Sequence, residues 1–374
     1  MPTRTERRTD SEWMEQVLAL AAQGHGLASP NPLVGALVVH DAQAVGQSFH
    51  TYDGVKHAEV LALEQAGVQA RGATLYTNLE PCCRPGRTPP CVDAILAAGV
   101  ARVVAAMADP NPAVNGRGFE QLRAAGVEVS VGLHEEEARR LNEAFTCYIR
   151  TGLPQVTLKA ALTLDGKIAS SVEGHRWISS EESRAVVQTL RHQHDAVLTG
   201  VGTVLADDPL LTDRTGRPRR RPLLRVVLDT RLRTPLEAQL VRTAANDVLV
   251  FASEDASPGK RRELEARGVQ VEFVKEVGGK LGLRAVLTQL AARDLTSVLL
   301  EGGAHINANA LEASRVDKVF LFYAPKFFRN DHSLPLLAPT GLPESAPMLR
   351  NYRLHRFGSD FAVEGYLRDV YRDH

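Results

Sequence analysis

Cysteine is scarce in this chain, with only four residues among 374. Three of them, Cys82, Cys83 and Cys91, fall within ten residues, which favours a metal site over a disulfide framework. Long apolar runs are also missing, because the stretch 94–108 is too short to span a bilayer and is interrupted by Arg102. The first twelve residues lack the apolar segment of a signal peptide. We therefore expect a cytoplasmic protein without a membrane segment.

An excess of charge of either sign is absent, since Lys plus Arg and Asp plus Glu both total 44. Such a chain has no overall field that would attract nucleic acid or an anionic membrane. Basic residues interleaved with aromatic ones, which are typical of nucleic-acid surfaces, are missing too. The apolar content of 44% is ordinary for a globular protein. A chain of 374 residues exceeds one ordinary core, so we expect two domains.

The first part of the chain alternates predicted strands with predicted helices. An apolar face at helical spacing, capped by Asp10 or Ser11, predicts the first helix. Further helices are predicted at 57–66, 91–98 and 116–125, and strands at 33–39, 44–48, 74–78, 102–106 and 127–131. This alternation predicts a layered α/β domain over residues 10–150.

A second predicted domain follows Gly152-Leu153-Pro154 and covers residues 153–374. Its predicted strands are 155–162, 196–199, 224–228, 247–251, 269–274, 298–301 and 318–323, and its predicted helices are 180–192, 260–267, 283–292 and 304–313. The pattern predicts another α/β unit. Two glycine pairs, Gly200 with Gly202 and Gly302 with Gly303, suit phosphate binding at a helix start. Neither pair completes the G-x-G-x-x-G fingerprint, so a Rossmann dinucleotide fold is not predicted.

Four residues of the first domain carry the clearest chemistry: His57, Glu59, Cys82 and Cys91. One imidazole and two thiolates supply three zinc ligands, and a catalytic zinc keeps its fourth position for water. Zinc lowers the pKa of that water to near neutrality. Glu59 is not needed as a ligand and is placed to move the water proton to a ring nitrogen and then to a departing amine. The set predicts a hydrolytic deaminase.

Zinc-dependent nucleobase deaminases share the pattern H-x-E followed by P-C-x-x-C. Here the second cysteine follows Pro81-Cys82 after nine residues. The alternative is a core histidine, with a closed structural zinc site or with none. Cys83 is a rival ligand beside Cys82, and Cys147 is expected to be a buried structural thiol.

Longer segments of the first domain resemble the bifunctional riboflavin-biosynthesis deaminase-reductase family, in which the nine-residue cysteine offset is usual. These segments are 31–35 (Asn-Pro-Leu-Val-Gly), 57–60 (His-Ala-Glu-Val), 86–91 (Gly-Arg-Thr-Pro-Pro-Cys) and 109–112 (Asp-Pro-Asn-Pro). The resemblance implies a cytidine-deaminase-like three-layer α/β/α domain with one bound zinc ion. It also implies contacts with the pyrimidine or its ribosyl phosphate from Asn31, His50, Arg87, Asp109 and Asn111. His50 and Asp109 also suit ordinary loop positions.

Arg84 departs from the family pattern. The family usually has Pro-Cys-Ser-His where residues 81–84 are Pro-Cys-Cys-Arg. That histidine is not a zinc ligand in the family, so zinc binding is expected to persist. Arg84 either replaces its hydrogen bond and adds a phosphate contact, or it weakens deamination; we count it among the substrate-binding residues. Arg87 has a physical reason for its place, because a guanidinium grips phosphate with two hydrogen bonds.

Segments of the second domain resemble the reductase half of the same family, which is similar to dihydrofolate reductase in fold and uses NADPH. These segments are 158–167, 176–178, 203–209 and 301–303. The resemblance implies NADPH contacts from Ala161, Trp177, Thr203, Thr230, Gly303, Ala304, His305, Ile306, Asn307, Ala308 and Asn309. It implies substrate contacts from Lys159, His175, Arg191, Asp207, Leu211, Arg214 and Glu301.

Some of these residues have a simpler interpretation. Asp207 and Asp208 also suit a capped turn before Pro209, and Trp177 also suits core packing. The segment Arg214–Arg225, with six arginines, is either a solvated loop or a patch that holds ligand phosphates. The general acid of the reductase stays open, with Lys159, Asp207 and Glu301 as its candidates.

The resemblance implies a bifunctional enzyme of riboflavin biosynthesis. It would deaminate 2,5-diamino-6-(5-phosphoribosylamino)pyrimidin-4(3H)-one and then reduce the ribosyl group with NADPH, giving 5-amino-6-(5-phosphoribitylamino)uracil. We expect a small-molecule substrate, no nucleic-acid or membrane partner, and a homo-oligomer (dimer or tetramer). The alternatives are an enzyme with one active domain and one binding module, a nucleic-acid-editing deaminase, and a non-enzymatic pyrimidine-binding regulator.

Overall fold

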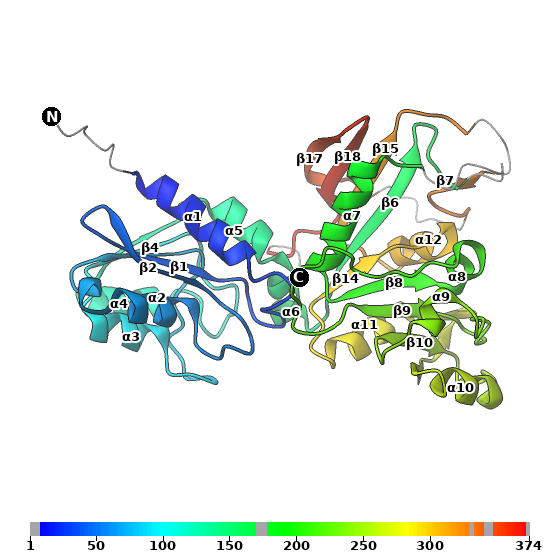
Figure 1. Ribbon diagram of the computed structural model, residues 1–374, viewed down its shortest axis with the longest axis horizontal. Helices are drawn as coiled ribbons and strands as arrows, with labels where there is room; N and C mark the ends of the chain where they lie inside the picture. Colours follow the sequence, from blue (N-terminus) through cyan, green and yellow to red (C-terminus); the bar gives the residue numbers. More distant parts are fainter. Residues whose placement is uncertain (1–7, 170–177, 329–332, 340–346, 372–374) are drawn as a thin grey trace. The chain divides into compact units, whose positions relative to one another are not determined.

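The computed structural model describes residues 8–169, 178–328, 333–339 and 347–371. The chain divides into two compact units, which Figure 1 colours along the sequence. The first unit comprises Met1–Thr151 and Pro218–Arg220, and the second comprises Gly152–Arg217 and Arg221–His374. The short segment Pro218–Arg220 therefore belongs to the first unit, although its sequence neighbours belong to the second.

The first unit is built on a five-stranded sheet with the order β2-β1-β3-β4-β5. Its strands are β1 (Gly35–His40), β2 (Gln43–Phe49), β3 (Thr74–Thr77), β4 (Arg102–Ala105) and β5 (Glu128–Val131). Strand β1 is antiparallel to β2 and β3, whereas β3, β4 and β5 are parallel. The loops after β3 and β4 therefore leave the sheet at the same edge, the usual place for a ligand site in α/β folds.

Helices cover both faces of this sheet, which makes three layers (Figure 1). They are α1 (Asp10–Ala22), α2 (Ala58–Ala66), α3 (Cys91–Ala98), α4 (Arg117–Ala124), α5 (Glu135–Leu141) and α6 (Glu143–Thr151), with the short 3₁₀ helix η1 (Gly67–Ala70). The cap of α1 is Thr9, so the expected cap at Asp10 or Ser11 was wrong. Thr9 and Glu12 each accept a hydrogen bond from the other's backbone N–H. This capping box satisfies two backbone N–H groups, whereas a single capping side chain satisfies one, so the helix begins after Thr9.

The second unit is built on a nine-stranded sheet with the order β11-β10-β9-β8-β14-β6-β15-β18-β17. Its strands are β6 (Gln155–Thr163), β8 (Ala196–Gly200), β9 (Leu224–Leu228), β10 (Val248–Ala252), β11 (Val269–Phe273), β14 (Ser297–Leu300), β15 (Lys318–Ala324), β17 (Arg350–Phe357) and β18 (Asp360–Tyr366). The strands from β11 to β15 are parallel, and β18 and β17 add an antiparallel hairpin at one edge.

Both faces of the parallel part of this sheet are buried. Val226 packs in one core with Leu249, whereas the next residue, Val227, packs in another with Val250. Such alternation follows from the two-residue period of a strand, and a parallel sheet covered on both faces needs apolar residues at every position. The covering helices are α7 (Glu181–Gln193), α8 (Val201–Asp207), α9 (Gln239–Arg242), α10 (Pro258–Glu265), α11 (Leu283–Ala291) and α12 (Ala304–Glu312). Two small ribbons complete the unit, β7 (Lys167–Ala169) with β16 (Leu334–Pro335) and β12 (Glu276–Val277) with β13 (Lys280–Leu281).

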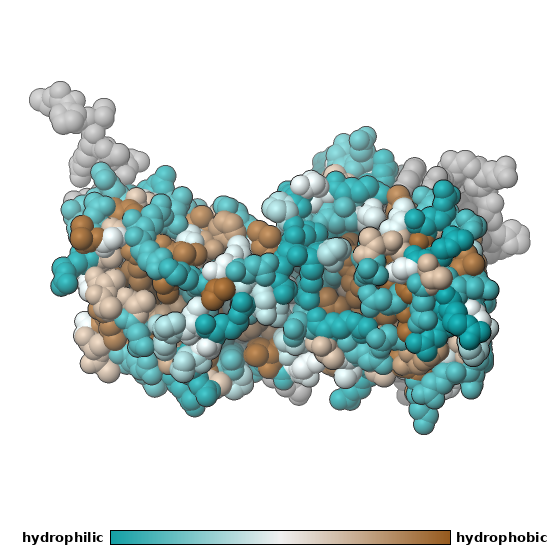
Figure 2. All heavy atoms as spheres, turned by 60° about the horizontal axis from the view of Figure 1, so that its bottom comes forward, coloured by the Kyte–Doolittle hydropathy of each residue, from teal (hydrophilic) through white to brown (hydrophobic). Residues whose placement is uncertain are grey.

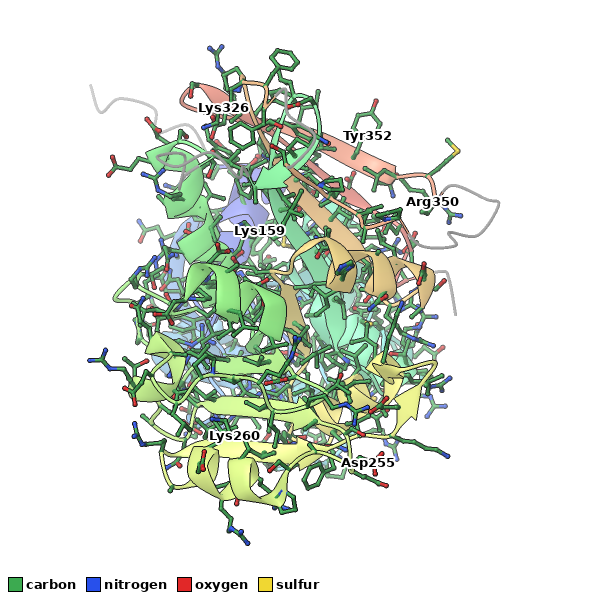
Figure 3. All side chains as sticks on the ribbon, turned by 90° about the vertical axis from the view of Figure 1, so that its right-hand side faces the viewer. Lys159, Asp255, Lys260, Lys326, Arg350 and Tyr352 are labelled. Carbon is green, nitrogen blue, oxygen red and sulfur yellow. The ribbon has the colours of Figure 1, made fainter. Side chains whose placement is uncertain are left out.

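The predicted α/β class is confirmed in both units, whereas helices α5, α6 and α8 and the hairpin β17–β18 were not predicted. Strand β17 shows why: it contains three arginines and nearly all of its residues are exposed, so no buried apolar face marks it as a strand. Figure 3 shows Tyr352 projecting outward from this edge, whereas Lys159 lies inside the unit.

On the face drawn in Figure 2, hydrophobic residues form small areas between hydrophilic ones rather than one broad apolar area. No helix within the described ranges combines the length and the apolarity that crossing a bilayer requires.

Candidate active sites

Three predicted ligands of the first unit meet at the ends of two helices. His57 caps α2, Cys91 begins α3, and Cys82 lies in the loop after β3. Their ligand atoms all lie within 4.8 Å of one another. The Nδ1 atom of His57 is 3.0 Å from Cys91 Sγ and 3.4 Å from Cys82 Sγ. Cys83 is outside this cluster, and Cys147 is fully buried as expected.

The geometry of this cluster fits a zinc ion. Tetrahedral zinc with bonds of about 2.0 Å to nitrogen and about 2.3 Å to sulfur holds these atoms roughly 3.5 Å apart. The observed separations require only small outward shifts. Glu59, in the first turn of α2, is buried, and its Oε2 has no hydrogen-bond partner among the described residues. A buried carboxylate oxygen without a partner is costly, so a water molecule held beside the three ligands would satisfy it.

The electrostatics of the cluster suit metal binding and proton transfer. A hydrogen bond with Cys91 lowers the pKa of Cys82 to about 4. The same contact with Cys82, together with burial, raises the pKa of Cys91, so the two sulfurs hold one proton when no metal is bound. Burial raises the pKa of Glu59. A raised pKa makes the carboxylate of Glu59 a stronger base than an ordinary glutamate, which suits it to accept a proton.

Asn31 and His50 form a polar pair beside the cluster. His50 Nδ1 lies 3.2 Å from the carbonyl oxygen of Lys56, which only accepts, so Nδ1 carries the proton. His50 Nε2 therefore accepts a hydrogen bond from Asn31 Nδ2 at 2.9 Å. Burial lowers the pKa of His50 to about 4, and the neighbouring His57 adds to the effect. The imidazole is neutral near pH 7, and the bond orients the amide of Asn31.

Asp109 and Asn111 lie on the loop after β4, and Glu80 fixes this loop. The carboxylate of Glu80 accepts hydrogen bonds from the backbone N–H groups of Asp109, Gly116 and Gly118, at 3.0, 2.8 and 2.8 Å. Asp109 in turn accepts from the N–H of Asn111 at 2.8 Å. Burial raises the pKa of Asp109 to about 6. Glu80 was missed at the sequence level because it acts only on backbone groups, although it directly precedes Pro81-Cys82.

Two further buried asparagines escaped the sequence analysis. Asn78 and Asn142 hold the segment that follows Asn31, since both donate to the carbonyl of Leu33, at 2.8 and 3.0 Å. Asn78 also accepts from the N–H of Gly35, and Asn142 from that of Leu33, both at 2.8 Å. Asn78 ends a predicted strand, but no sequence signal connects Asn142 to residue 33. Arg84 and Arg87 are exposed on the loop between the two ligand cysteines.

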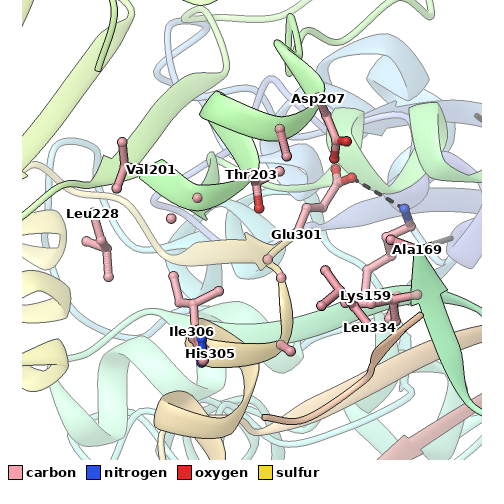
Figure 4. Close-up of a pocket in the computed structure, with 18 of the residues that line it drawn as sticks. Lys159, Ala169, Val201, Thr203, Asp207, Leu228, Glu301, His305, Ile306 and Leu334 are labelled. Carbon is pink, nitrogen blue, oxygen red and sulfur yellow. Dashed lines mark hydrogen bonds and ion pairs between the residues drawn. The ribbon is translucent and has the colours of Figure 1, made fainter. Parts of the chain in front are cut away.

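The second unit holds a cavity of about 810 Å³, drawn in Figure 4. It opens beside the carboxyl ends of β8, β9 and β14, as expected for a parallel sheet. Thirteen of the predicted residues line it: Lys159, Ala161, Arg191, Thr203, Asp207, Arg214, Thr230, Glu301, Gly303, Ala304, His305, Ile306 and Asn309. Its size suits a cofactor with a small substrate.

Three predicted residues are not part of the cavity lining. Leu211 packs in a small core with Val197 and Leu223. Asn307 is fully buried and donates to the carbonyls of Gly302 and Leu336 at 3.2 Å, and Ala308 is fully buried as well. The positions of Asn307 and Ala308 follow from the helical turn of α12, which points every third or fourth side chain into the core. His175 and Trp177 lie outside the described residues.

A network of one carboxylate and two cations lies at the polar end of this cavity. Glu301 accepts from Arg191 Nε at 2.6 Å and Nη2 at 3.0 Å, and from Lys159 Nζ at 3.4 Å. Burial alone would raise the pKa of Glu301, but Lys159 and Arg191 outweigh it and lower this pKa to about 2. Figure 4 shows Asp207 next to Glu301. Glu301 therefore stays ionised and is unsuited to donate a proton.

The other end of the cavity suits the phosphates of a dinucleotide. Helix α12 begins there at Gly303, which has no side-chain cap, so its first N–H groups remain available to an anion. A Cβ at the preceding residue, Gly302, would overlap Ile306. Because Gly302 has no side chain, the backbone can lie close to the cavity here. Thr203, in α8, lines the same cavity. These residues fit NADPH.

Taken together, the three zinc-ligand residues and the two folds define a zinc-dependent deaminase joined to a nicotinamide-dependent reductase. Residues 7–107 match the cytidine and deoxycytidylate deaminase zinc-binding region, and residues 154–363 match the RibD C-terminal domain. The chain belongs to the RibD family of riboflavin biosynthesis. It is a bifunctional deaminase and NADPH-dependent reductase, as the sequence resemblance implied.

Relatives of this family are similar along nearly the whole chain. The riboflavin biosynthesis protein RibD of Aquifex aeolicus is 41% identical over 96% of this chain and 98% of its own. That of Escherichia coli is 38% identical over 95% of this chain and 98% of its own. The structure of Acinetobacter baumannii RibD (form 1) superposes with a TM-score of 0.81 at 35% identity, covering 96% of this chain and 98% of that chain. The Thermotoga maritima diaminohydroxyphosphoribosylaminopyrimidine deaminase/5-amino-6-(5-phosphoribosylamino)uracil reductase gives 0.80 at 35% identity, covering 95% and 98%.

Proposed function

We propose that residues 10–150 remove the 2-amino group of 2,5-diamino-6-(5-phosphoribosylamino)pyrimidin-4(3H)-one as ammonia. One observation carries this proposal: the buried, unpartnered Oε2 of Glu59 lies on the same helix turn as His57, beside two cysteine ligands. The matching name of the Thermotoga maritima relative supports this choice of substrate. A closed structural zinc site would not require a proton-transfer residue such as Glu59.

In this mechanism His57, Cys82 and Cys91 would hold the zinc ion, which would supply a water molecule of lowered pKa. Glu59 accepts the water proton at Oε2. It then donates a proton to the ring nitrogen and carries the next one to the departing amine. The raised pKa of Glu59, caused by its burial, suits this shuttle because the group must bind and release a proton in each turnover.

The substrate contacts follow from the residues that surround the cluster. Asn31, oriented by neutral His50, presents its amide to the pyrimidine, and Asp109 and Asn111 border the ring from the loop after β4. Arg87, with Arg84 in the same exposed loop, binds the ribosyl phosphate. Arg84 adds a cation where the family usually has a histidine.

We propose that residues 153–374 reduce the ribosyl group of the deaminated product to ribityl. NADPH supplies the hydride, and the chain positions it. Ala161, Thr203, Thr230 and the start of α12 bind the cofactor, and Lys159, Arg191, Asp207, Arg214 and Glu301 hold the substrate. Because Lys159 and Arg191 lower the pKa of Glu301 to about 2, Glu301 anchors these two cations. This leaves Lys159 and Asp207 as candidates for the general acid.

Steady-state assays of each half with its own purified intermediate test this assignment. We expect ammonia release from the diamino substrate without NADPH, and NADPH oxidation with the deaminated intermediate. Turnover by only one half would support the alternative of one active domain and one binding module. Absence of ammonia release from zinc-loaded protein would contradict the deaminase assignment.

We also propose that the chain assembles as a homo-oligomer in the cytoplasm. Strand β17 is last in its sheet, and Tyr352 and Leu354 on it are 63% and 68% exposed. An exposed edge strand with apolar side chains favours pairing with another chain. The four cysteines are all unpaired thiols, which fits a reducing compartment. Light scattering on the purified protein measures the assembly, and the mass of a monomer would contradict it.

A further inference from the structure

The six arginines of the segment Arg214–Arg225 do not act as one patch. Arg225 is buried at 1% exposure and binds the carboxylate of Asp247 through two nitrogens, at 2.8 and 3.1 Å. Arg214 lines the cavity of the second unit. Arg220 instead belongs to the first unit, within the segment Pro218–Arg220. Because Arg220 belongs to the first unit, the reductase activity does not explain why this arginine is present.

Arg220 is held against two loops of the deaminase unit. Its backbone N–H donates to the carbonyl of Gly26 at 2.8 Å, and its Nη1 donates to that of Ser29 at 3.1 Å. Its Nε lies 3.1 Å from Asp53 Oδ1. Its guanidinium lies over the ring of Tyr52, 3.9 Å from the ring centroid. These contacts fix the direction of a side chain that is 23% exposed.

Arg87 lies over the same ring. Its guanidinium is 4.4 Å from the centroid of Tyr52, and its Nη1 donates to the carbonyl of Tyr52 at 3.1 Å. One tyrosine thus gathers a residue from the loop between the ligand cysteines and a residue from a distant part of the sequence. Guanidinium groups stack on aromatic rings and keep their edges free for planar hydrogen bonding.

The pair carries an uncompensated positive charge. Within the described part of the chain, Asp53 is the only carboxylate bonded to either guanidinium, and its side chain is 74% exposed. Two cations against one solvated anion leave a net charge of about +1. The described hydrogen bonds use only Nε and Nη1 of Arg220 and Nη1 of Arg87, so several N–H groups remain available to an anion.

The position of the pair matches the far end of a phosphorylated substrate. Tyr52 is two residues from His50, and Ser29 is two residues from Asn31. Two extended residues span at most about 7 Å. The backbone carbonyls of Tyr52 and Ser29, which Arg87 and Arg220 contact, therefore belong to chain segments close to His50 and Asn31.

We propose that Arg220 is a specificity-determining residue of the deamination, which binds the substrate phosphate together with Arg87. The inference rests on the proposed function of the first unit. It means that this unit needs a short segment from the sequence of the second half to recognise its substrate.

The test compares ammonia release from the phosphorylated diamino substrate and from its dephosphorylated counterpart, for wild type, Arg220→Ala and Arg217→Ala. Arg217 is exposed three residues earlier, so its variant matches the charge change. For Arg220→Ala we expect the KM of the phosphorylated substrate to rise roughly 10- to 100-fold, since a charge-assisted contact is lost. Values for the dephosphorylated compound, zinc content and reductase turnover should stay within about twofold, as should all values for Arg217→Ala.

The outcomes separate the inference from the proposed function. If wild type prefers the phosphorylated compound and Arg220→Ala keeps that preference, Arg220 does not bind the phosphate. If both compounds lose activity equally in the variant, the preference is unchanged, so Arg220 is merely structural and the inference is wrong. If the preference is lost, Arg220→Lys, which restores the charge, should recover part of it. If wild type releases ammonia from neither compound, the proposed function itself is wrong.

Discussion

Two buried glutamates show how surroundings assign different tasks to the same side chain. Glu59 is 3% exposed, and its burial raises its pKa more than the nearby imidazole of His57 lowers it. Glu301 is buried as well, but Lys159 and Arg191 overcome the cost of burial and lower its pKa to about 2. The first group suits proton transfer, and the second stays an anion that organises two cations.

Replacing Glu59 with Gln should remove proton transfer while keeping the shape of the site. We expect deamination to fall by about 10²- to 10⁴-fold, the usual contribution of a general base. An ammonia assay under saturating substrate measures it. Zinc content and reductase turnover serve as controls and should match wild type. Ammonia release within a few-fold of wild type would refute the role of Glu59.

Replacing Glu301 with Gln should destabilise the second unit. A pKa lowered from 4.5 to about 2 corresponds to about 3 kcal/mol at neutral pH. Loss of the anion also removes the carboxylate that orients Arg191 and Lys159 in the cavity, so reductase turnover should fall roughly 100-fold. Urea unfolding measures the difference. Glu263→Gln, in an exposed pair with Lys260, is the control and should change stability by about 0.5 kcal/mol or less.

The same glutamate predicts a pH dependence with a definite sign. Because the pKa of Glu301 is lowered in the folded state by Lys159 and Arg191, its stabilisation is complete above the unfolded value of about 4.5. It is lost as the pH falls from there to about 2. The stability difference between wild type and Glu301→Gln should therefore be constant above about pH 5 and shrink below it. A difference that grows on acidification would contradict the ion pairing.

At the scale of elements, strongly periodic segments were predictable and segments without an apolar pattern were not. Helix α3 and strand β9 have the predicted bounds, because Cys91–Ala98 and Leu224–Leu228 are short apolar segments between loops. Helices α5 and α6 and the hairpin β17–β18 were missed. Helix α5 is mostly charged and strand β17 is exposed along nearly its whole length, so no core-facing apolar pattern marks them in the sequence. Pairing of β17 with β18, rather than periodicity, decides the structure of the hairpin.

The candidate sites divide in the same way. His57, Cys82 and Cys91, which the structure brings together, were predictable from residue type and spacing, whereas the role of Glu301 was implied only by the family resemblance. Glu80 and Asn142 were not predictable, because they bond to backbone groups that only the folded chain brings near. The family pattern likewise does not reveal that the side chain of Leu211 packs in a small core with Val197 and Leu223.

Helix α4 must approach the ligand loop closely, and Gly118 allows this. A Cβ at this residue would overlap the carbonyl oxygen of Pro81, next to Cys82. Gly118→Ala should therefore displace the loop that carries a zinc ligand. We expect a loss of about 1–3 kcal/mol in the first unit, as for other overpacked positions, with weaker zinc binding. Thermal unfolding and competition with a chelator measure both effects.

A matched glycine substitution serves as the control. Gly259 lies in helix α10 of the second unit, where a Cβ would meet only Ser257 Oγ, at 3.7 Å. Gly259→Ala should be neutral or slightly stabilising, because Ala favours a helix more than Gly does. If Gly118→Ala kept wild-type stability and zinc affinity, close packing of α4 on the ligand loop would not matter for the site.

At the scale of the whole molecule, two chemistries occupy two separate units. The zinc cluster belongs to the first unit, and the cavity with Glu301 to the second. The segment Pro218–Arg220 is the exception, since it lies in the sequence of the second half but belongs to the first unit. The two activities should therefore respond separately to treatments that affect one site.

Zinc removal is such a treatment. A strong chelator should stop ammonia release, while NADPH oxidation with the deaminated intermediate continues within about twofold of the untreated rate. Restoring zinc should release a proton, because contact with Cys82 and burial raise the pKa of Cys91 and keep that thiol protonated without metal. Calorimetry in two buffers of different protonation enthalpy measures this proton. Equal loss of both activities on chelation would contradict independent sites.

The most direct test combines zinc analysis with turnover of the diamino substrate, with and without NADPH. We predict one zinc ion per chain and one ammonia per substrate without NADPH, with the deaminated ribosyl compound accumulating. Addition of NADPH should then oxidise one NADPH per ammonia released and yield the ribityl product. Zinc-loaded protein that releases no ammonia, or that oxidises NADPH before any ammonia appears, would contradict the account.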